Sequence, residues 1–157
     1  MSTSSDNPSR FQVSLRIWHP SADPLEIGRE LEWAPEASRK AGEPRTTLKG
    51  NPLPGLNKES FWYAVLPVTE ESTLSSVIGA TNRRLISRKH YLASLVSTGG
   101  VLEYFIGWFI DSNVGECIDW ETLLGCGELK IRLQFDVYPP DTEPLPPPEK
   151  TKPTVAP

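Results

Sequence analysis

The chain has few of the residues that bind metals or form covalent intermediates. It contains two cysteines and two histidines among its 157 residues. Cys117, Cys126, His19 and His90 do not have the spacing of a recognised metal-ligand motif, and two cysteines do not make a disulfide framework. The sequence therefore predicts reduced thiols, no metal site and no cofactor.

Catalytic motifs are missing as well. No Gly-x-Ser-x-Gly turn is present to carry a nucleophilic serine. The segment 50–55, Gly-Asn-Pro-Leu-Pro-Gly, lacks the Gly-Lys-Ser/Thr of a phosphate-binding loop, and its two prolines remove backbone amides that such a loop needs. The carboxylates of Glu116 and Asp119 are more simply capping or solvated groups. We therefore favour a protein that is not an enzyme, while a cryptic hydrolase stays open.

Long apolar runs are also absent. The sequence has no uninterrupted apolar stretch near the roughly 18 residues that suggest a membrane span, and residues 1–10 are polar and contain no apolar segment of a signal peptide. The net charge of −4 disfavours nucleic acid as a partner, because phosphate neutralisation needs a basic surface. These features predict a cytoplasmic protein with no membrane partner.

The residues that are present predict one globular domain. Hydrophobic residues make up 38% of the chain and five are tryptophans, a composition that supports a packed core. The length fits a single domain. We place this domain at residues 11–138, after a disordered N-terminus over 1–10 and before a disordered, Pro-rich tail over 139–157.

Three stretches have the alternation of β-strands. Phe11–Trp18 and Leu129–Tyr138 each have one apolar and one polar face. Val101–Asp111 is apolar in both registers, which is typical of a strand covered on both sides, so we predict that it is the central strand. One register contains Val101, Phe105 and Phe109; the other contains Leu102, Tyr104, Ile106, Trp108 and Ile110.

Helices are expected between these strands. Asp23 and Pro24 are a good N-cap and first residue for a helix within 21–33. The 3.6-residue period over 69–100 predicts one long helix or, with a break near Ile86, two helices in tandem. A strand at 59–66, a short strand at 115–118 and a small helix from residue 119 complete the order. The sequence predicts an α+β fold with a mainly antiparallel sheet of about four to six strands, helices packed mostly on one face, and loosely duplicated β-α-β halves.

The connection over residues 34–58 is long, basic and predicted to be irregular, apart from a possible edge strand around Arg45–Leu48. Connections of this length are often functional. The basic residues of this segment and of the helix at 83–89 are either an ordinary solvated surface or a docking surface for an acidic or anionic partner. The candidate binding residues are Arg39, Lys40, Arg45, Lys49, His19 and Trp62.

Scattered residues give the chain a likeness to a known family. The pattern Phe11-x-Val-x-Leu-x-Ile-Trp-His-Pro with Asp23-Pro24 and Ile27, together with Lys40-Ala-Gly-Glu-Pro-Arg45, Lys49-Gly50, Ser60-Phe-Trp62 and the strand 129–138, resembles the bacterial domain-of-unknown-function family 4279 (DUF4279). The resemblance covers roughly residues 11–138. It implies a small bacterial cytosolic α+β protein with no assigned activity, and it transfers no catalytic residue.

We consequently expect a non-enzymatic protein-binding module, similar to an immunity protein or an inhibitor, with another bacterial protein as its partner. The alternative is a small-molecule or anion binder that uses the basic 34–58 connection. Helices on one face of the sheet would leave one side of the strand 101–111 without cover, so we expect either the 34–58 connection or a second chain to lie over it. The far face of this strand is therefore the place to look for a pocket or a homodimer contact.

Overall fold

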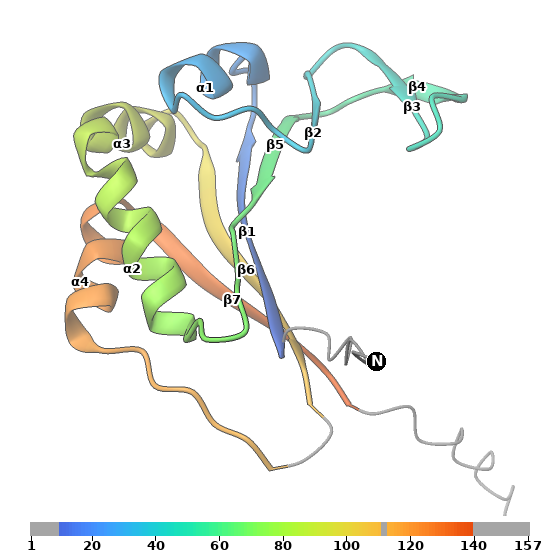
Figure 1. The fold of residues 1–157 in the computed structure, drawn as a ribbon. Coiled ribbons are helices and arrows are strands. Elements are labelled where there is room, and N and C mark those ends of the chain that lie inside the picture. Colours follow the sequence, from blue (N-terminus) through green and yellow to red (C-terminus); the bar gives the residue numbers. More distant parts are fainter. Residues whose placement is uncertain (1–9, 111–112, 140–157) are drawn as a thin grey trace, which may run out of the picture.

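The computed structural model describes residues 10–110 and 113–139 (Figure 1). The predictions for the N-terminus and the Pro-rich tail fall almost wholly outside these residues. The strands are β1 (Phe11–His19), β2 (Ala37–Arg39), β3 (Pro44–Thr46), β4 (Pro52–Leu56), β5 (Ser60–Val65), β6 (Val101–Phe109) and β7 (Ile131–Tyr138). The helices are α1 (Pro24–Glu30), α2 (Leu74–Leu85), the 3₁₀ helix η1 (Ile86–Arg88), α3 (Lys89–Ser97) and α4 (Trp120–Glu128).

Five strands form the main sheet in the order β2-β5-β1-β6-β7. β1 is antiparallel to β5 and β6, whereas β6 and β7 run parallel. The predicted α+β fold with a mainly antiparallel sheet is confirmed. The prediction that Val101–Asp111 is the central strand is wrong, because β1 is central and β6 lies beside it. A strand with one polar face can be central here, since one face of this sheet has no helix over it.

Helices α2, α3 and α4 lie on the same face of the sheet (Figure 1). The tandem interpretation of residues 69–100 is confirmed, with α2 ending at Leu85 and η1 beginning at Ile86. Helix α4 makes the crossover that the parallel pair β6–β7 requires. None of the described helices is long and apolar enough to cross a membrane. The suggested duplication of β-α-β halves stays a prediction.

The core lies between this helical layer and the sheet. Alternate residues of β1 point into it, and their partners on β5 and β6 point the same way. The prediction for the strand 129–138 holds only at its start: Ile131 is buried, but Phe135 and Val137 are 40% and 49% exposed. The largest fully buried side chains are Trp62, Tyr104, Leu15, Ile17, Ile27, Leu66, Leu74, Ile78, Leu85, Leu92, Leu102 and Ile106.

A buried hydrogen-bond network joins α2 to α4 and β6. The Asn82 side chain on α2 accepts a bond from the Tyr104 hydroxyl (2.9 Å) and donates one to the Thr122 carbonyl (3.1 Å). Gly125 makes this close approach possible, because a Cβ there would lie 2.8 Å from the Asn82 amide nitrogen. The network therefore fixes how α4 packs on α2.

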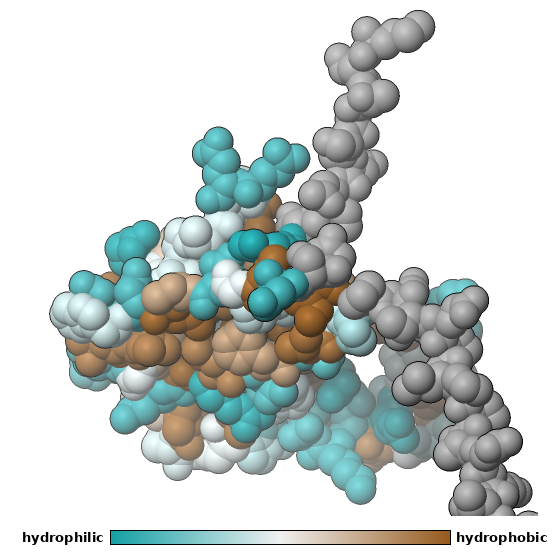
Figure 2. Space-filling view, turned by 90° about the horizontal axis from the view of Figure 1, so that it is seen from below, coloured by the Kyte–Doolittle hydropathy of each residue, from teal (hydrophilic) through white to brown (hydrophobic). Residues whose placement is uncertain are grey.

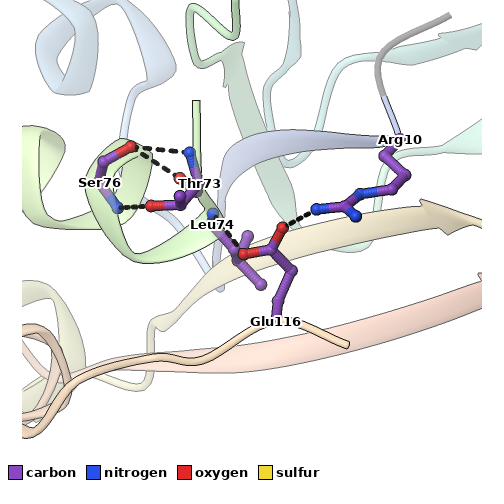
Figure 3. A network of polar contacts seen from close by, with 5 residues as sticks. All are labelled: Arg10, Thr73, Leu74, Ser76 and Glu116. Carbon is purple, nitrogen blue, oxygen red and sulfur yellow. Dashed lines mark hydrogen bonds and ion pairs between the residues drawn. The ribbon is translucent and has the colours of Figure 1, made fainter. Parts of the chain in front are cut away.

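The prediction of a strand over residues 115–118 is wrong. The Glu116 carboxylate lies at the start of α2, where it accepts a bond from the Leu74 amide (3.4 Å) and pairs with Arg10 (Figure 3). The same helix end has a capping box between Thr73 and Ser76. The positive end of the helix dipole stabilises a carboxylate at this place. The segment is thus held by a side chain and not by sheet pairing.

Residues 34–58 contain three short strands and are not a single irregular connection. β2 pairs with β5 at the sheet edge, while β3 and β4 form a separate two-stranded sheet. The suggested edge strand at Arg45–Leu48 overlaps β3. Prolines at positions 44, 52 and 54 concealed the strands from sequence analysis, because proline cannot donate a hydrogen bond to a β-ladder.

Candidate functional site

The hairpin arm, residues 43–57, extends from the body on the side opposite to α2, α3 and α4 (Figure 1). It contains β3, β4 and the turn that joins them, and every residue of both strands is exposed. Its base is closed by a bond from the Asn57 amide to the Glu43 carbonyl (2.9 Å), and its turn by one from the Thr47 amide to the Asn51 carbonyl (2.8 Å). The arm is therefore a built hairpin that buries almost nothing of its own.

The tip of the arm combines apolar and positively charged side chains. Leu48 is fully exposed, at 104%, and Leu56 on β4 is 57% exposed. Lys49 follows Leu48, and Arg45 on β3 reaches only the Pro54 carbonyl, at 3.4 Å. Within residues 10–110 and 113–139, neither cation has an ion-pair partner. The arm thus presents an exposed leucine beside unpaired positive charges.

Two further candidate residues lie where the arm leaves the body. The Lys40 ammonium is 2.6 Å from the Asp23 carboxylate, and this hydrogen bond raises the pKa of Lys40 and lowers that of Asp23. The Arg39 guanidinium lies over the Phe61 ring, 4.9 Å from its centroid. Both cations already have intramolecular contacts, so Arg45 and Lys49 are the freer members of the predicted set.

His19 ends β1 and is buried, with 5% of its surface exposed. Its Nδ1 atom accepts bonds from the amides of Ser21 (3.0 Å) and Ala22 (2.8 Å), while Nε2 lies 2.8 Å from the Thr98 hydroxyl. Because Nδ1 accepts two amide hydrogens, the ring is neutral with its proton on Nε2. His19 locks the turn after β1, and its predicted role in binding stays a prediction.

This geometry predicts that acidification destabilises the protein through His19. Burial lowers the pKa of His19 below its usual value of 6.5. As the pH falls below 6.5, the unfolded histidine takes up a proton that the folded one does not, so stability is lost as the pH falls toward the folded pKa. We expect the urea midpoint to fall between pH 7.5 and 5.5, and this slope to be shallower in His19→Gln.

The exposed His90 provides the control for this measurement. His90→Gln should leave the pH slope of the urea midpoint as it is in the parent protein. An unchanged slope in His19→Gln would contradict the assignment, whatever the absolute stability of that variant.

Trp62, the last predicted binding residue, is completely buried on β5. Its ring packs edge-on against Trp33, with centroids 6.2 Å apart. Among the described residues, its indole nitrogen has no hydrogen-bond partner. The structure therefore places Trp62 in the core, away from the surface that a partner could reach, and its binding role stays a prediction.

Arg84 and Arg88, within the predicted basic region 83–89, contact the segment after α1. The Arg84 guanidinium donates to the Glu32 carbonyl (3.0 Å) and lies over the Trp33 ring, 4.0 Å from its centroid. Arg88 pairs with the Glu32 carboxylate at 2.5 Å. These two arginines hold the helical layer against the chain that leads to β2, so they are partly occupied within the fold.

The open face of the sheet, opposite the helices, is rich in aromatic rings. It holds a hollow of about 510 Å³ whose wall includes residues from β1, β5, β6 and β7. The sequence predicted a pocket or a dimer contact on the far face of the strand 101–111, and the hollow lies there; the dimer stays a prediction. No residue of 34–58 lines it. The lining residues used below are Ser14, Arg16, Tyr63, Phe105, Gly107 and Tyr138.

Arg16 is a charged lining residue that sequence analysis did not single out. Its guanidinium lies 3.5 Å from the centroid of the Phe105 ring, and its Nε donates to the Ser14 hydroxyl (3.2 Å). Glu103, opposite Arg16 in the β1–β6 register, pairs with Arg132 at 2.7 Å. The only sequence signal for Arg16 was an arginine within a predicted strand. This pattern is as typical of an ordinary solvent-facing position as of a binding residue.

An apolar surface also lies on α4. Trp120, Leu123 and Leu124 are spaced on one helical face and are 67%, 47% and 56% exposed. In the view from below, apolar residues form a band across the surface of the molecule (Figure 2). Exposed apolar surfaces often mark protein–protein contacts. This stripe on α4 is therefore the main alternative to the hairpin arm as a docking site.

Comparison with known proteins places the chain in a family. No curated protein and no solved structure matches it. A family model described as a domain of unknown function, DUF4279, matches residues 9–140, which include all the strands and helices described above. The chain therefore belongs to the DUF4279 family.

Proposed function

We propose that this protein is a bacterial, cytosolic protein-binding module without enzymatic activity, comparable to an immunity protein or an inhibitor. It binds an acidic partner protein through the hairpin arm. The observation that carries the proposal is the fully exposed Leu48 at the tip of the arm, beside Arg45 and Lys49, which form no ion pair with any other described residue.

The arm suits a preformed contact. A two-stranded hairpin is marginal by itself in water, and β3 and β4 bury no core residue that could support it. Three prolines in these strands restrict the unfolded chain and so favour the hairpin. A preorganised arm loses less conformational entropy on binding than a flexible segment would.

Charge and apolarity together define the partner. The chain carries a net charge of −4, whereas the arm contains Arg45 and Lys49 against one carboxylate, Glu43, so its charge is opposite in sign to that of the whole chain. Such a patch steers the encounter with a negatively charged surface, and an exposed leucine gains most when it enters an apolar recess. The partner should therefore present a recess for Leu48 with carboxylates at its rim.

The alternative of a small-molecule site under the 34–58 connection has less support. Small-molecule sites are concave and cover most of the ligand, whereas all five residues of β4 are exposed. The arm extends from the body (Figure 1) and offers a projecting surface in place of a cavity.

Site-specific crosslinking tests the proposal. A photoreactive phenylalanine analogue replaces Leu48, Trp120 or Leu25 in the full chain, and each protein is illuminated in extract of its source cells. We expect one acidic protein to be captured through position 48 and not through position 25, an exposed leucine on α1. Capture of the same protein through position 120 alone would overturn the role of the arm.

Affinity measurements with the captured protein then test the chemistry. We expect Leu48→Asp to weaken binding about 30-fold, the loss typical of an interface hot spot. Lys49→Glu should slow association and reduce its dependence on salt. Leu25→Asp and Lys89→Glu are the matched controls and should leave affinity unchanged. Equal affinity of Leu48→Asp and the parent protein would contradict the proposal.

A further inference from the structure

The hollow on the open face has the dimensions and walls of a small-molecule site. Its volume of about 510 Å³ falls within the range of roughly 300–1,000 Å³ that is common for ligand pockets. Gly107 contributes to this space, because its missing side chain leaves room above β6: an added Cβ would lie 3.6 Å from the Tyr138 ring. Any side chain larger than hydrogen at position 107 would therefore begin to fill the hollow.

The walls of the hollow are suited to a flat apolar group. Phe61 and Tyr63 stack on one side, with ring centroids 5.7 Å apart. Phe109 and Tyr138 stack on the other side, with centroids 5.1 Å apart and planes inclined by 17°. All four residues line the hollow. An aromatic ring that lies against either pair would gain both buried area and ring–ring contacts.

Arg16 supplies a specific polar contact in this apolar setting. The Phe105 ring and the Ser14 hydroxyl fix its guanidinium, and it forms no ion pair within the described parts of the chain. Two carboxylates come from the neighbouring strands: Glu103 pairs with Arg132, and Asp136 accepts a bond from the Tyr138 hydroxyl. Neither lines the hollow. A positioned guanidinium with unused donors binds a carboxylate with two parallel hydrogen bonds.

We propose that this hollow binds a small aromatic carboxylate, with the carboxylate on Arg16 and the ring against the aromatic side chains of the open face. A phosphate ester fits less well, since one arginine supplies the only cation among the lining residues and most of the wall is apolar. This site is separate from the hairpin arm, so each can fail its test without the other.

The test uses the full chain and matched pairs of probes. Phenylacetate and indole-3-acetate are compared with phenylacetamide and indole-3-acetamide, which keep the ring and lose the charge. Binding is followed by the backbone amide shifts of β1 and β6 in NMR titrations. We expect each carboxylate to bind about tenfold or more tightly than its amide, because a charge-assisted hydrogen bond is lost in the amide.

Substitutions of Arg16 and Gly107 test where the ligand binds. Arg16→Gln should remove the preference for carboxylate over amide, and Arg16→Lys should keep part of it, because lysine keeps the charge without the fork. Gly107→Leu should abolish binding of both probes by filling the hollow, with Gly107→Ala as the milder change if leucine impairs folding. Arg83→Gln is the control, since it removes the same charge from an arginine on α2, which lies on the opposite face of the sheet and does not line the hollow.

Several results would overturn the proposal. Carboxylates and amides could bind equally well, or Arg83→Gln could weaken binding as much as Arg16→Gln does, which would indicate general attraction of anions. Equal binding to Gly107→Leu and the parent protein would place the ligand elsewhere. If none of the four probes shifts the amide signals of β1 and β6 at about 10 mM, a concentration near the weakest Kd expected for such a site, the hollow does not bind these ligands.

Discussion

Trp62→Ala is expected to lower the free energy of unfolding by about 3–5 kcal/mol, the usual cost of truncating a large buried ring. Trp62 has no exposed surface and packs against Trp33 and close to Gly28. Its removal leaves a cavity between β5 and α1 that the backbone of both elements limits. A domain of this size is stable by about 5–15 kcal/mol in total, so the loss should be evident in urea unfolding.

Trp62→Phe separates packing from hydrogen bonding. The indole nitrogen is buried without a partner among the described residues, so phenylalanine gives up ring area but no hydrogen bond. We expect a cost of about 1–2 kcal/mol, smaller than that of Trp62→Ala, because fewer buried atoms are removed and no hydrogen bond is lost. Leu25→Ala on the surface should change stability by less than about 0.5 kcal/mol. A stable Trp62→Ala protein that fails only in partner binding would show that Trp62 is an anchor and not a core residue.

Asn82→Asp is expected to cost about 3–5 kcal/mol at pH 7, although it changes a single atom of the side chain. The new carboxylate can still accept the bond from the Tyr104 hydroxyl, but it cannot donate to the Thr122 carbonyl. Asn82 is 6% exposed and Tyr104 is fully buried, so the negative charge would be removed from water at a buried site. Urea unfolding measures the loss.

The pH dependence of this variant identifies the cause. Protonation of the new carboxylate restores a donor and removes the charge, so the difference from the parent protein should narrow as the pH falls toward 4. Asn51→Asp, in the exposed turn of the hairpin arm, should change stability by less than about 0.5 kcal/mol at any of these pH values. A pH-independent loss in Asn82→Asp would indicate a packing defect and contradict the hydrogen-bond network.

Local sequence signals predicted most of the elements. Phe11–Trp18 forms a strand because its apolar and polar residues alternate with a period of two and show no helical period. Asp23 caps α1 by accepting a hydrogen bond from the Leu25 amide at 2.9 Å. The helices over 69–100 and from residue 119 also form where the 3.6-residue period and the caps indicated them. Each of these signals is contained within a few residues, so no distant contact is needed to create it.

Other features depend on contacts that sequence patterns do not contain. The segment 115–118 has strand-like residues, but the Glu116 carboxylate reaches the start of α2, some forty positions earlier in the chain. The strands β3 and β4 form despite their prolines, because each has only one partner and leaves its other edge to solvent. In both places a long-range contact or an edge position overrode the local preference.

The sequence by itself determined which residues share a face: the period of two in β1, β6 and β7 assigns each side chain to one side of the sheet or the other. Only the tertiary structure decided which side the helices cover, which strand is central and where a hollow remains. The reason is physical. Alternation is a property of one strand, whereas the open-face hollow brings Arg16, Tyr63 and Phe105 together from three strands whose order follows from packing of the whole chain.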